Sequence, residues 1–177
     1  MVNRSAHSHN ALKATAEVLS LYGEVLAQAV HTLDIGIDST VALPRITPPD
    51  SVRHTYYIRL TLKDAQGGVL STNFYVESKV EGDNTDLLSL PRVDVEHATT
   101  YERTGGVWTA TTTLRNAHAT PAMMIRLNLR AADGGQILPA TYSDNYFHLM
   151  PGEAKVVVTT FRDEDTRGER PVMEVDW

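Results

Sequence analysis

The sequence predicts an all-β protein made of two layered β-sandwich domains, and three observations support this prediction. Apolar and polar residues alternate with a period of two in several separate stretches, as in strands with one buried and one solvated face. Turn sequences rich in glycine and proline separate those stretches. Two segments, Leu62–Gly68 and Leu129–Gly135, share Leu, Ala and a Gly-Gly pair at the same spacing, which indicates two copies of one strand-and-hairpin unit.

The first half is predicted to be an N-terminally truncated sandwich over residues 1–80. Its clearest strand is Tyr56–Lys63, in which Tyr57 falls on the polar face. Prolines at 44, 48 and 49 disfavour ladder pairing, so Ile46–Arg53 is expected to be loop. A helix over Leu12–Val30 is the alternative for the first strands, but Gly23 and the two-residue period argue against it. The expected strands are Ala11–Val18, Val25–Ala29 with a fading continuation to Asp38, Thr40–Leu43, Tyr56–Lys63 and Val69–Val76.

The second half is predicted to be a complete sandwich over residues 93–177. The polar stretch Glu77–Asp86 is expected to contain the domain boundary, with a linker at 81–92. Met-Pro-Gly-Glu at 150–153 is expected to be a tight β-turn, because proline presets the first turn position and glycine supplies a positive φ at the second. Arg162–Arg170 is expected to be a charged loop. The expected strands are Trp108–Leu114, Met123–Leu129, Tyr146–Met150, Ala154–Phe161 and Met173–Trp177.

The bulk composition excludes several classes of function. The chain has 177 residues, 42% of them hydrophobic, and a net charge of −6, so it offers no basic face for nucleic acid or anionic lipid. It contains no cysteine, which excludes disulfides and thiolate chemistry. No apolar run is long enough to span a bilayer, and the first residues lack the apolar core of a signal peptide. A neutral ligand such as a sugar fits this composition.

One segment carries a family resemblance. Ser143-Asp-Asn-Tyr-Phe-His-Leu-Met-Pro-Gly-Glu153 resembles the signature of the last immunoglobulin-like domain in glycosidases of glycoside hydrolase family 2, in the branch of exo-β-D-glucosaminidases and β-mannosidases. Leu60–Tyr75 is similar to the family's preceding sandwich domain, and Asp86–Asp94 is similar to its interdomain linker. Val2–Ser5 resembles the middle of a strand in the family's first sandwich domain. The resemblance implies two tandem immunoglobulin-like domains from the C-terminal part of a periplasmic or secreted bacterial enzyme.

The resemblance carries over no catalytic residue, because the family's two catalytic glutamates lie on a barrel domain that would precede Met1. The acidic run Asp163–Asp165 is expected to be a solvated loop, which lacks the fixed geometry of a catalytic pair. A serine triad has no supporting motif. His7 and His9 could bind a metal loosely but lack a third ligand, so no metal and no cofactor is expected. Asn3-Arg4-Ser5 fits a glycosylation acceptor, a pattern common by chance.

Aromatic rings are the remaining candidates for a site, because they stack on the apolar face of a sugar. Most lie in alternating strands, where core packing explains them. Two could instead bind carbohydrate or contact another domain. They are Tyr57, on the polar face of its strand, and Tyr101, near the turn at Glu102–Gly106. Asp144 and Asn145 are expected to satisfy backbone groups of their loop. The remaining members of the structural motif are Tyr146, Phe147, Pro151 and Gly152.

The sequence therefore predicts a non-catalytic brace for the absent barrel of a glycosidase. The expected partners are that intramolecular catalytic barrel and an oligosaccharide, with neither nucleic acid nor membrane. Two alternatives stay open: a carbohydrate-binding module with an exposed aromatic platform, and a tandem adhesion module. The brace predicts an apolar surface where the barrel belongs, whereas an adhesion module predicts a self-sufficient unit.

Overall fold

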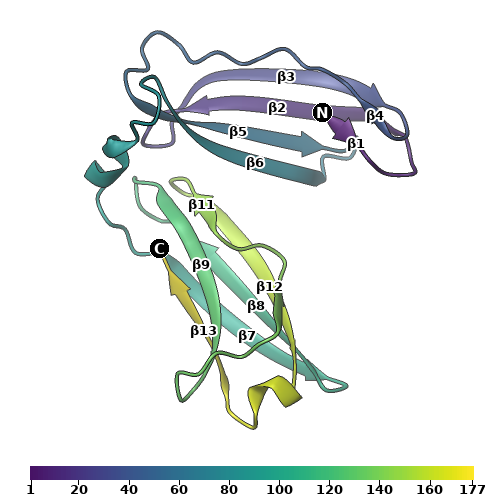
Figure 1. Ribbon diagram of the computed structural model, residues 1–177, viewed down its shortest axis with the longest axis vertical. Coiled ribbons are helices and arrows are strands. Elements are labelled where there is room, and N and C mark those ends of the chain that lie inside the picture. The colour runs from purple at the N-terminus through teal and green to yellow at the C-terminus, as the bar shows by residue number, and fades with distance from the viewer. The chain divides into compact units, whose positions relative to one another are not determined.

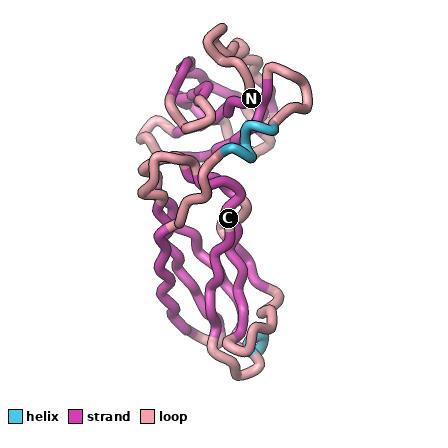
Figure 2. Tube along the Cα trace, turned by 90° about the vertical axis from the view of Figure 1, so that its left-hand side faces the viewer, coloured by secondary structure: helices cyan, strands magenta, loops and turns pink.

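The computed structural model describes residues 1–177 and is built almost entirely of antiparallel strands. Its only helices are two short 3-10 turns, shown in cyan in Figure 2. The chain divides into two compact units, Met1–Leu90 and Pro91–Trp177. The prediction of an all-β protein is confirmed, and the helical alternative for Leu12–Val30 is wrong. No helix has the length and apolar character needed to cross a membrane.

The first unit is organised around a four-stranded antiparallel sheet with the strand order β3-β2-β5-β6 (Figure 1). Ala16 of β2 faces Ala29 of β3 on one side and Leu60 of β5 on the other. Because side chains alternate between faces, this register gathers the apolar residues of the three strands on one face. The strands are β2 (His9–Leu19), β3 (Val25–Ile35), β5 (Thr55–Lys63) and β6 (Val69–Ser78).

A small second layer lies against that apolar face. It consists of the paired two-residue strands β1 (Val2–Asn3) and β4 (Ser39–Thr40) and of the irregular segment that follows them. The strand predicted at Thr40–Leu43 ends at Thr40, and Ile46–Arg53 contains no strand, as its prolines predict. The buried cluster of this unit contains Val18, Val52 and Tyr56, with Ala27, Ile46 and Ile58 packed at its border.

The segment 81–92, expected to be a linker, contains the 3-10 helix η1 (Thr85–Ser89). The carboxylate of Asp86 accepts a hydrogen bond from the backbone N–H of Thr55 at 3.1 Å, which ties η1 to the start of β5. Residues up to Leu90, and therefore η1, belong to the first compact unit.

The second unit is a two-layer sandwich. One sheet has the order β10-β12-β8-β7 and the other the order β11-β9-β13. Side chains from both inner faces form one buried cluster that includes Leu114, Ile125, Leu127 and Val157, each at most 2% exposed. The strands are β7 (Glu96–Thr104), β8 (Val107–Arg115), β9 (Ala122–Ala131), β10 (Ala140–Tyr142), β11 (Phe147–Leu149), β12 (Ala154–Arg162) and β13 (Pro171–Asp176). A 3-10 turn, η2 (Glu164–Thr166), lies between the last two.

Both copies of the internal repeat form the same turn. Asp64 N–H donates to Gly68 O and Gly67 N–H donates to Asp64 O, and Ala131 and Gly134 make the equivalent bonds in the second unit. Gly67 and Gly134 have φ angles of 88° and 89°, a region that disfavours residues with a Cβ atom. The shared Gly-Gly pair therefore reflects one turn conformation that the chain uses twice.

The sequence pattern missed two strands of the second unit, β7 and β10. β7 is an edge strand whose residues are mostly exposed, so its sequence shows no apolar alternation.

The strand predicted at Tyr146–Met150 begins one residue later than expected. The φ of Tyr146 is 58°, in the left-handed region, and β11 begins at Phe147.

Val157 and Val156 provide a matched test of this core, because they are neighbours of the same type on opposite faces of β12. Val157 is fully buried, whereas Val156 is 55% exposed. Val157→Ala should lower the free energy of unfolding by about 2 kcal/mol, and Val156→Ala by less than about 0.5 kcal/mol. Both tryptophans lie in the second unit, so fluorescence-monitored urea unfolding measures this effect. Equal losses for the two variants would contradict the assigned faces.

Candidate functional site

The segment Ser143–Glu153, which carries the family resemblance and is called the signature segment below, closes an open edge of strand β9. β11 pairs with β9 only between Ala122 and Ile125, so the backbone of Leu127 faces no strand on that side. The Asn145 side chain takes the place of a strand there: its Oδ1 accepts from Leu127 N–H at 2.8 Å, and its Nδ2 donates to Leu127 O at 2.9 Å. Further along, the Tyr142 hydroxyl accepts from Leu129 N–H at 2.9 Å. Side chains thus seal an edge that would otherwise expose hydrogen-bonding groups.

Asp144 and Phe147 both contact Lys155 of β12. The Asp144 carboxylate forms an ion pair with Lys155 Nζ at 2.5 Å, and that ammonium lies 4.7 Å from the centre of the Phe147 ring. Phe147 is only 8% exposed. The contact combines an ion pair with a cation–π interaction and anchors β11 against β12.

The Pro-Gly turn connects the two sheets. Glu153 N–H donates to Met150 O at 3.1 Å, and Gly152 has a φ of 77°, so Pro151 and Gly152 occupy the two central positions of the turn. Fully buried Asn116 follows β8, and its Nδ2 donates both to Leu149 O in β11 and to Thr120 O, at 2.9 and 2.8 Å. The Asn116 amide therefore links the end of one sheet to the other.

Tyr146 and Met124 are exposed residues with unusual backbone geometry. Their φ angles are 58° and 56°, and their side chains are 58% and 56% exposed. Met124 N–H donates to His148 Nδ1 at 3.0 Å. Burial lowers the pKa of His148, because desolvation disfavours the imidazolium form. Neutral His148 is the form that accepts this hydrogen bond.

Neither tyrosine proposed for carbohydrate binding presents an open ring. Tyr57 is fully buried, its hydroxyl donates to Leu21 O at 3.2 Å, and its ring centre lies 5.1 Å from that of Phe74. Burial raises the pKa of Tyr57 to about 12. Tyr101 is half-buried against the core of the second unit, where burial raises its pKa despite a hydrogen bond to the backbone of Met173. The placement of Tyr57 on a solvated face is wrong, because the two faces of β5 are both covered at that position.

The polar groups considered for chemistry have structural partners. Asp163 accepts hydrogen bonds from Trp108 Nε1 at 2.8 Å and Arg103 Nη2 at 2.5 Å. Asn3, the proposed glycosylation acceptor, is 8% exposed, and its amide donates to the carbonyls of His7 and Gly36. No group of three or more His, Cys, Asp or Glu side chains is placed to hold a metal ion.

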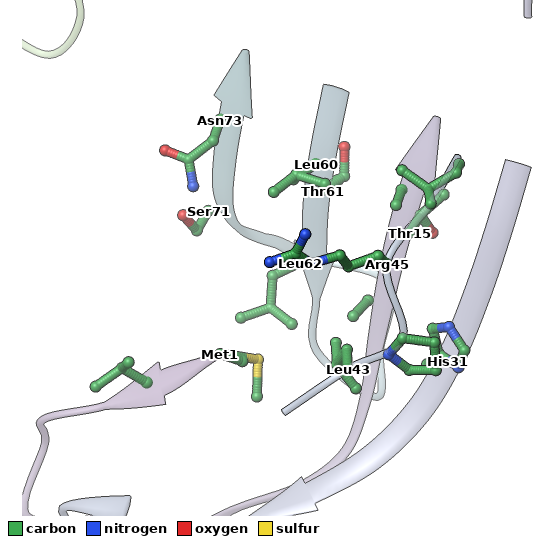
Figure 3. Close-up of a pocket in the computed structure, with 15 residues that line it drawn as sticks. Met1, Thr15, His31, Leu43, Arg45, Leu60, Thr61, Leu62, Ser71 and Asn73 are labelled. Atoms are coloured by element: carbon green, nitrogen blue, oxygen red, sulfur yellow. The ribbon is translucent and has the colours of Figure 1, made fainter. Parts of the chain in front are cut away.

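A groove of about 510 Å³ lies in the first unit between the four-stranded sheet and the small second layer (Figure 3). Leu60 and Leu62 of β5 and Ser71 and Asn73 of β6 line the sheet side. The opposite wall includes Met1, Val2 and the segment Leu43–Ile46. Figure 3 shows the Arg45 guanidinium extending over Leu62. The walls are largely apolar and carry no pair of carboxylates.

These features define a class of protein: a β-sandwich region in which ionisable and amide side chains fix strands and turns. Comparison with protein families matches residues 73–176 to the exo-β-D-glucosaminidase Ig-fold domain. This match covers more than half of the chain. The chain belongs to the family of exo-β-D-glucosaminidase Ig-fold domains.

Individual relatives agree with this assignment. The exo-β-D-glucosaminidase of Streptomyces avermitilis is 31% identical over 154 residues, which cover 73% of this chain and 17% of the relative. That of Arthroderma benhamiae is 27% identical over 172 residues, covering 86% of this chain and 19% of the relative. The chain thus spans about a fifth of the length of these curated relatives.

The crystal structure of the exo-chitosanase CsxA from Amycolatopsis orientalis matches 99% of this chain and 23% of its own chain, with 22% identity and a TM-score of 0.83. The match to CsxA shows the fold.

Asn145→Ala tests the sealed edge of β9. Removing the amide leaves the N–H and C=O of Leu127 without partners in a partly buried place, so unfolding of the second unit should become easier by about 2–3 kcal/mol. Asp144→Ala is the neighbouring control, because it removes a partly exposed ion pair and one hydrogen bond from Asn145 N–H, together worth about 1 kcal/mol. Tryptophan fluorescence in urea compares the two. A loss for Asn145→Ala no larger than that for the control would refute the role.

The lowered pKa of His148 predicts a dependence of stability on pH. A histidine whose folded pKa is below its unfolded value binds more protons when unfolded, so stability is complete above an unfolded pKa of about 6.5 and falls as the pH drops below it. Stability of the second unit should therefore decrease between about pH 7.5 and pH 5. His148→Gln should reduce this decrease, whereas His118→Gln at an exposed position should leave it unchanged. Identical pH profiles for the wild type and His148→Gln would show that the group does not titrate in this way.

Proposed function

We propose that this chain is a non-catalytic β-sandwich region of a glycoside hydrolase that braces a catalytic barrel domain. The observation that carries the proposal is the family match over residues 73–176, which falls on the Ig-fold part of much longer relatives. A sandwich supplies a stiff support because its backbone hydrogen bonds and its packed core fix its shape. Its role is to hold neighbouring parts of the enzyme in place.

The state of the acidic side chains supports a lack of catalysis by the chain itself. A glycosidase needs two carboxyl groups on a rigid frame, about 5–9.5 Å apart, on either side of the bond to be cleaved. Here six of the 22 acidic residues form separate ion pairs with basic residues, each with an N···O distance of 3.0 Å or less. The pairs are Glu17 with Arg59, Asp144 with Lys155, Asp163 with Arg103, Glu164 with Arg162, Asp176 with Arg126 and Glu174 with Arg130.

The relatives suggest what the parent enzyme acts on. Those of Streptomyces avermitilis and Arthroderma benhamiae are both named exo-β-D-glucosaminidases. We therefore infer that the parent polypeptide removes terminal β-linked glucosamine and that its barrel domain is the intramolecular partner of this region. Two tandem immunoglobulin-like domains, with the boundary between residues 81 and 92, are the arrangement proposed for this part of the parent.

A carbohydrate-binding module is less well supported. Such a module needs aromatic rings with an open face, and of the two rings that the sequence singled out for this role, that of Tyr57 is buried and that of Tyr101 is half-buried.

A chimera tests the brace. In the Streptomyces avermitilis exo-β-D-glucosaminidase, the matched region is either deleted or replaced by this chain. Deletion should abolish the yield of soluble, active enzyme, because the barrel loses its support. Replacement should restore the release of glucosamine from chitosan oligosaccharides. The isolated chain should release no glucosamine and should migrate freely in a chitosan-containing gel. An active deletion variant would refute the brace, and retarded migration abolished by Tyr101→Ala would establish a carbohydrate-binding module instead.

A further inference from the structure

The first unit has much less core than the second, although the two are similar in length and each contains a four-stranded sheet. Sixteen hydrophobic residues are buried in the second unit, fifteen of them in one cluster, whereas seven are buried in the first unit and only three of these form its cluster. An apolar sheet face is stable only when another layer covers it. In the second unit a three-stranded sheet provides that layer, whereas in the first it is provided by two strands of two residues and an irregular segment.

The groove marks where the cover is missing. Leu60 and Leu62 on its sheet side are half-buried, and the neighbouring β6 residues Ser71 and Asn73 are exposed. In Figure 3 these four side chains extend into the same space, opposite Met1. A volume of about 510 Å³ is large enough for several side chains of an added segment.

Strand β1 offers a free edge beside this groove. Met1 and Val41 exchange two backbone hydrogen bonds, since Met1 N donates to Val41 O at 2.7 Å and Val41 N–H donates to Met1 O at 2.9 Å. Successive residues of an antiparallel strand direct their backbone groups to opposite edges, so the N–H and C=O of Val2 face away from β4. β4 is the sole strand paired with β1, and Val2 is 58% exposed. Such an edge is a template for another strand.

Two polar groups in the groove lack partners within the chain. The Arg45 guanidinium over Leu62 makes no hydrogen bond or ion pair, and Nε2 of His31 is buried without a partner. Arg45 is the one charged side chain that lines the groove. An occupant that carries a carboxylate would complement it.

We propose that the groove receives an extended segment of the parent polypeptide, which pairs as a strand with the free edge of Val2, places alternate apolar side chains on Leu60 and Leu62, and brings an acidic side chain to Arg45. The inference rests on the proposed function, because the segment belongs to the polypeptide that carries the catalytic domain. It completes the second layer of the first unit and thereby fixes this region to the rest of the enzyme.

The absence of cysteine from the chain allows the groove to be probed by a single introduced thiol. Ser71→Cys places it in the groove, and Thr113→Cys places the control on an exposed position of β8 in the second unit. In the isolated chain both thiols should react with a maleimide at similar rates, at every protein concentration. In the chimera, the thiol of Ser71→Cys should react at least about tenfold more slowly than in the isolated chain, and that of Thr113→Cys should be unchanged. Arg45→Ala should partly restore the reactivity at position 71.

The outcomes separate the two proposals. An active chimera whose position 71 reacts as fast as in the isolated chain overturns the inference and leaves the brace intact. Protection in the isolated chain that grows with concentration also overturns it, because a second copy then fills the groove. If the chimera fails to fold, the deletion variant of the relative is coexpressed with this chain as a separate polypeptide instead. Copurification with a protected position 71 supports the inference, and loss of copurification overturns both proposals.

Discussion

The structure depends on one constraint: a β-sheet with an apolar face has to be covered by a second layer. The second unit satisfies it with two sheets whose inner faces meet around residues such as Ile125 and Val157. The first unit satisfies it incompletely, since part of the face formed by Leu60 and Leu62 borders an open groove. Burial of apolar surface is the main favourable term in folding, so the covered unit has the larger source of stability.

Polar side chains complete the sandwich where strands cannot. Asn145 and Tyr142 bind the exposed edge of β9, and Asn116 joins the end of β8 to β11. Buried amides are stabilising only when their donors and acceptors are all satisfied, and here the backbone groups of turns and strand edges satisfy them. The same engagement leaves the signature segment without free acids, bases or nucleophiles.

Much of the fold could be predicted from local patterns, and the failures have physical causes. Alternation identified Tyr56–Lys63 and Ala154–Phe161, since one buried face leaves a period of two in the sequence. The edge strand β7 buries too little to leave that period. Tyr57 was assigned to the wrong environment because alternation predicts opposite faces but does not show that both faces are covered. The left-handed backbone of Tyr146 was not recognisable from a residue type that favours strands.

The sequence by itself determined the fold class, the two repeated hairpins and the family resemblance, because each depends on residues close together in the chain. Only the tertiary structure decided what the side chains contact. It placed the amide of Asn145 against Leu127, buried the ring of Tyr57, and left the Arg45 guanidinium over an apolar groove. These outcomes join residues that are far apart in sequence, and local periodicity carries no information about such pairs.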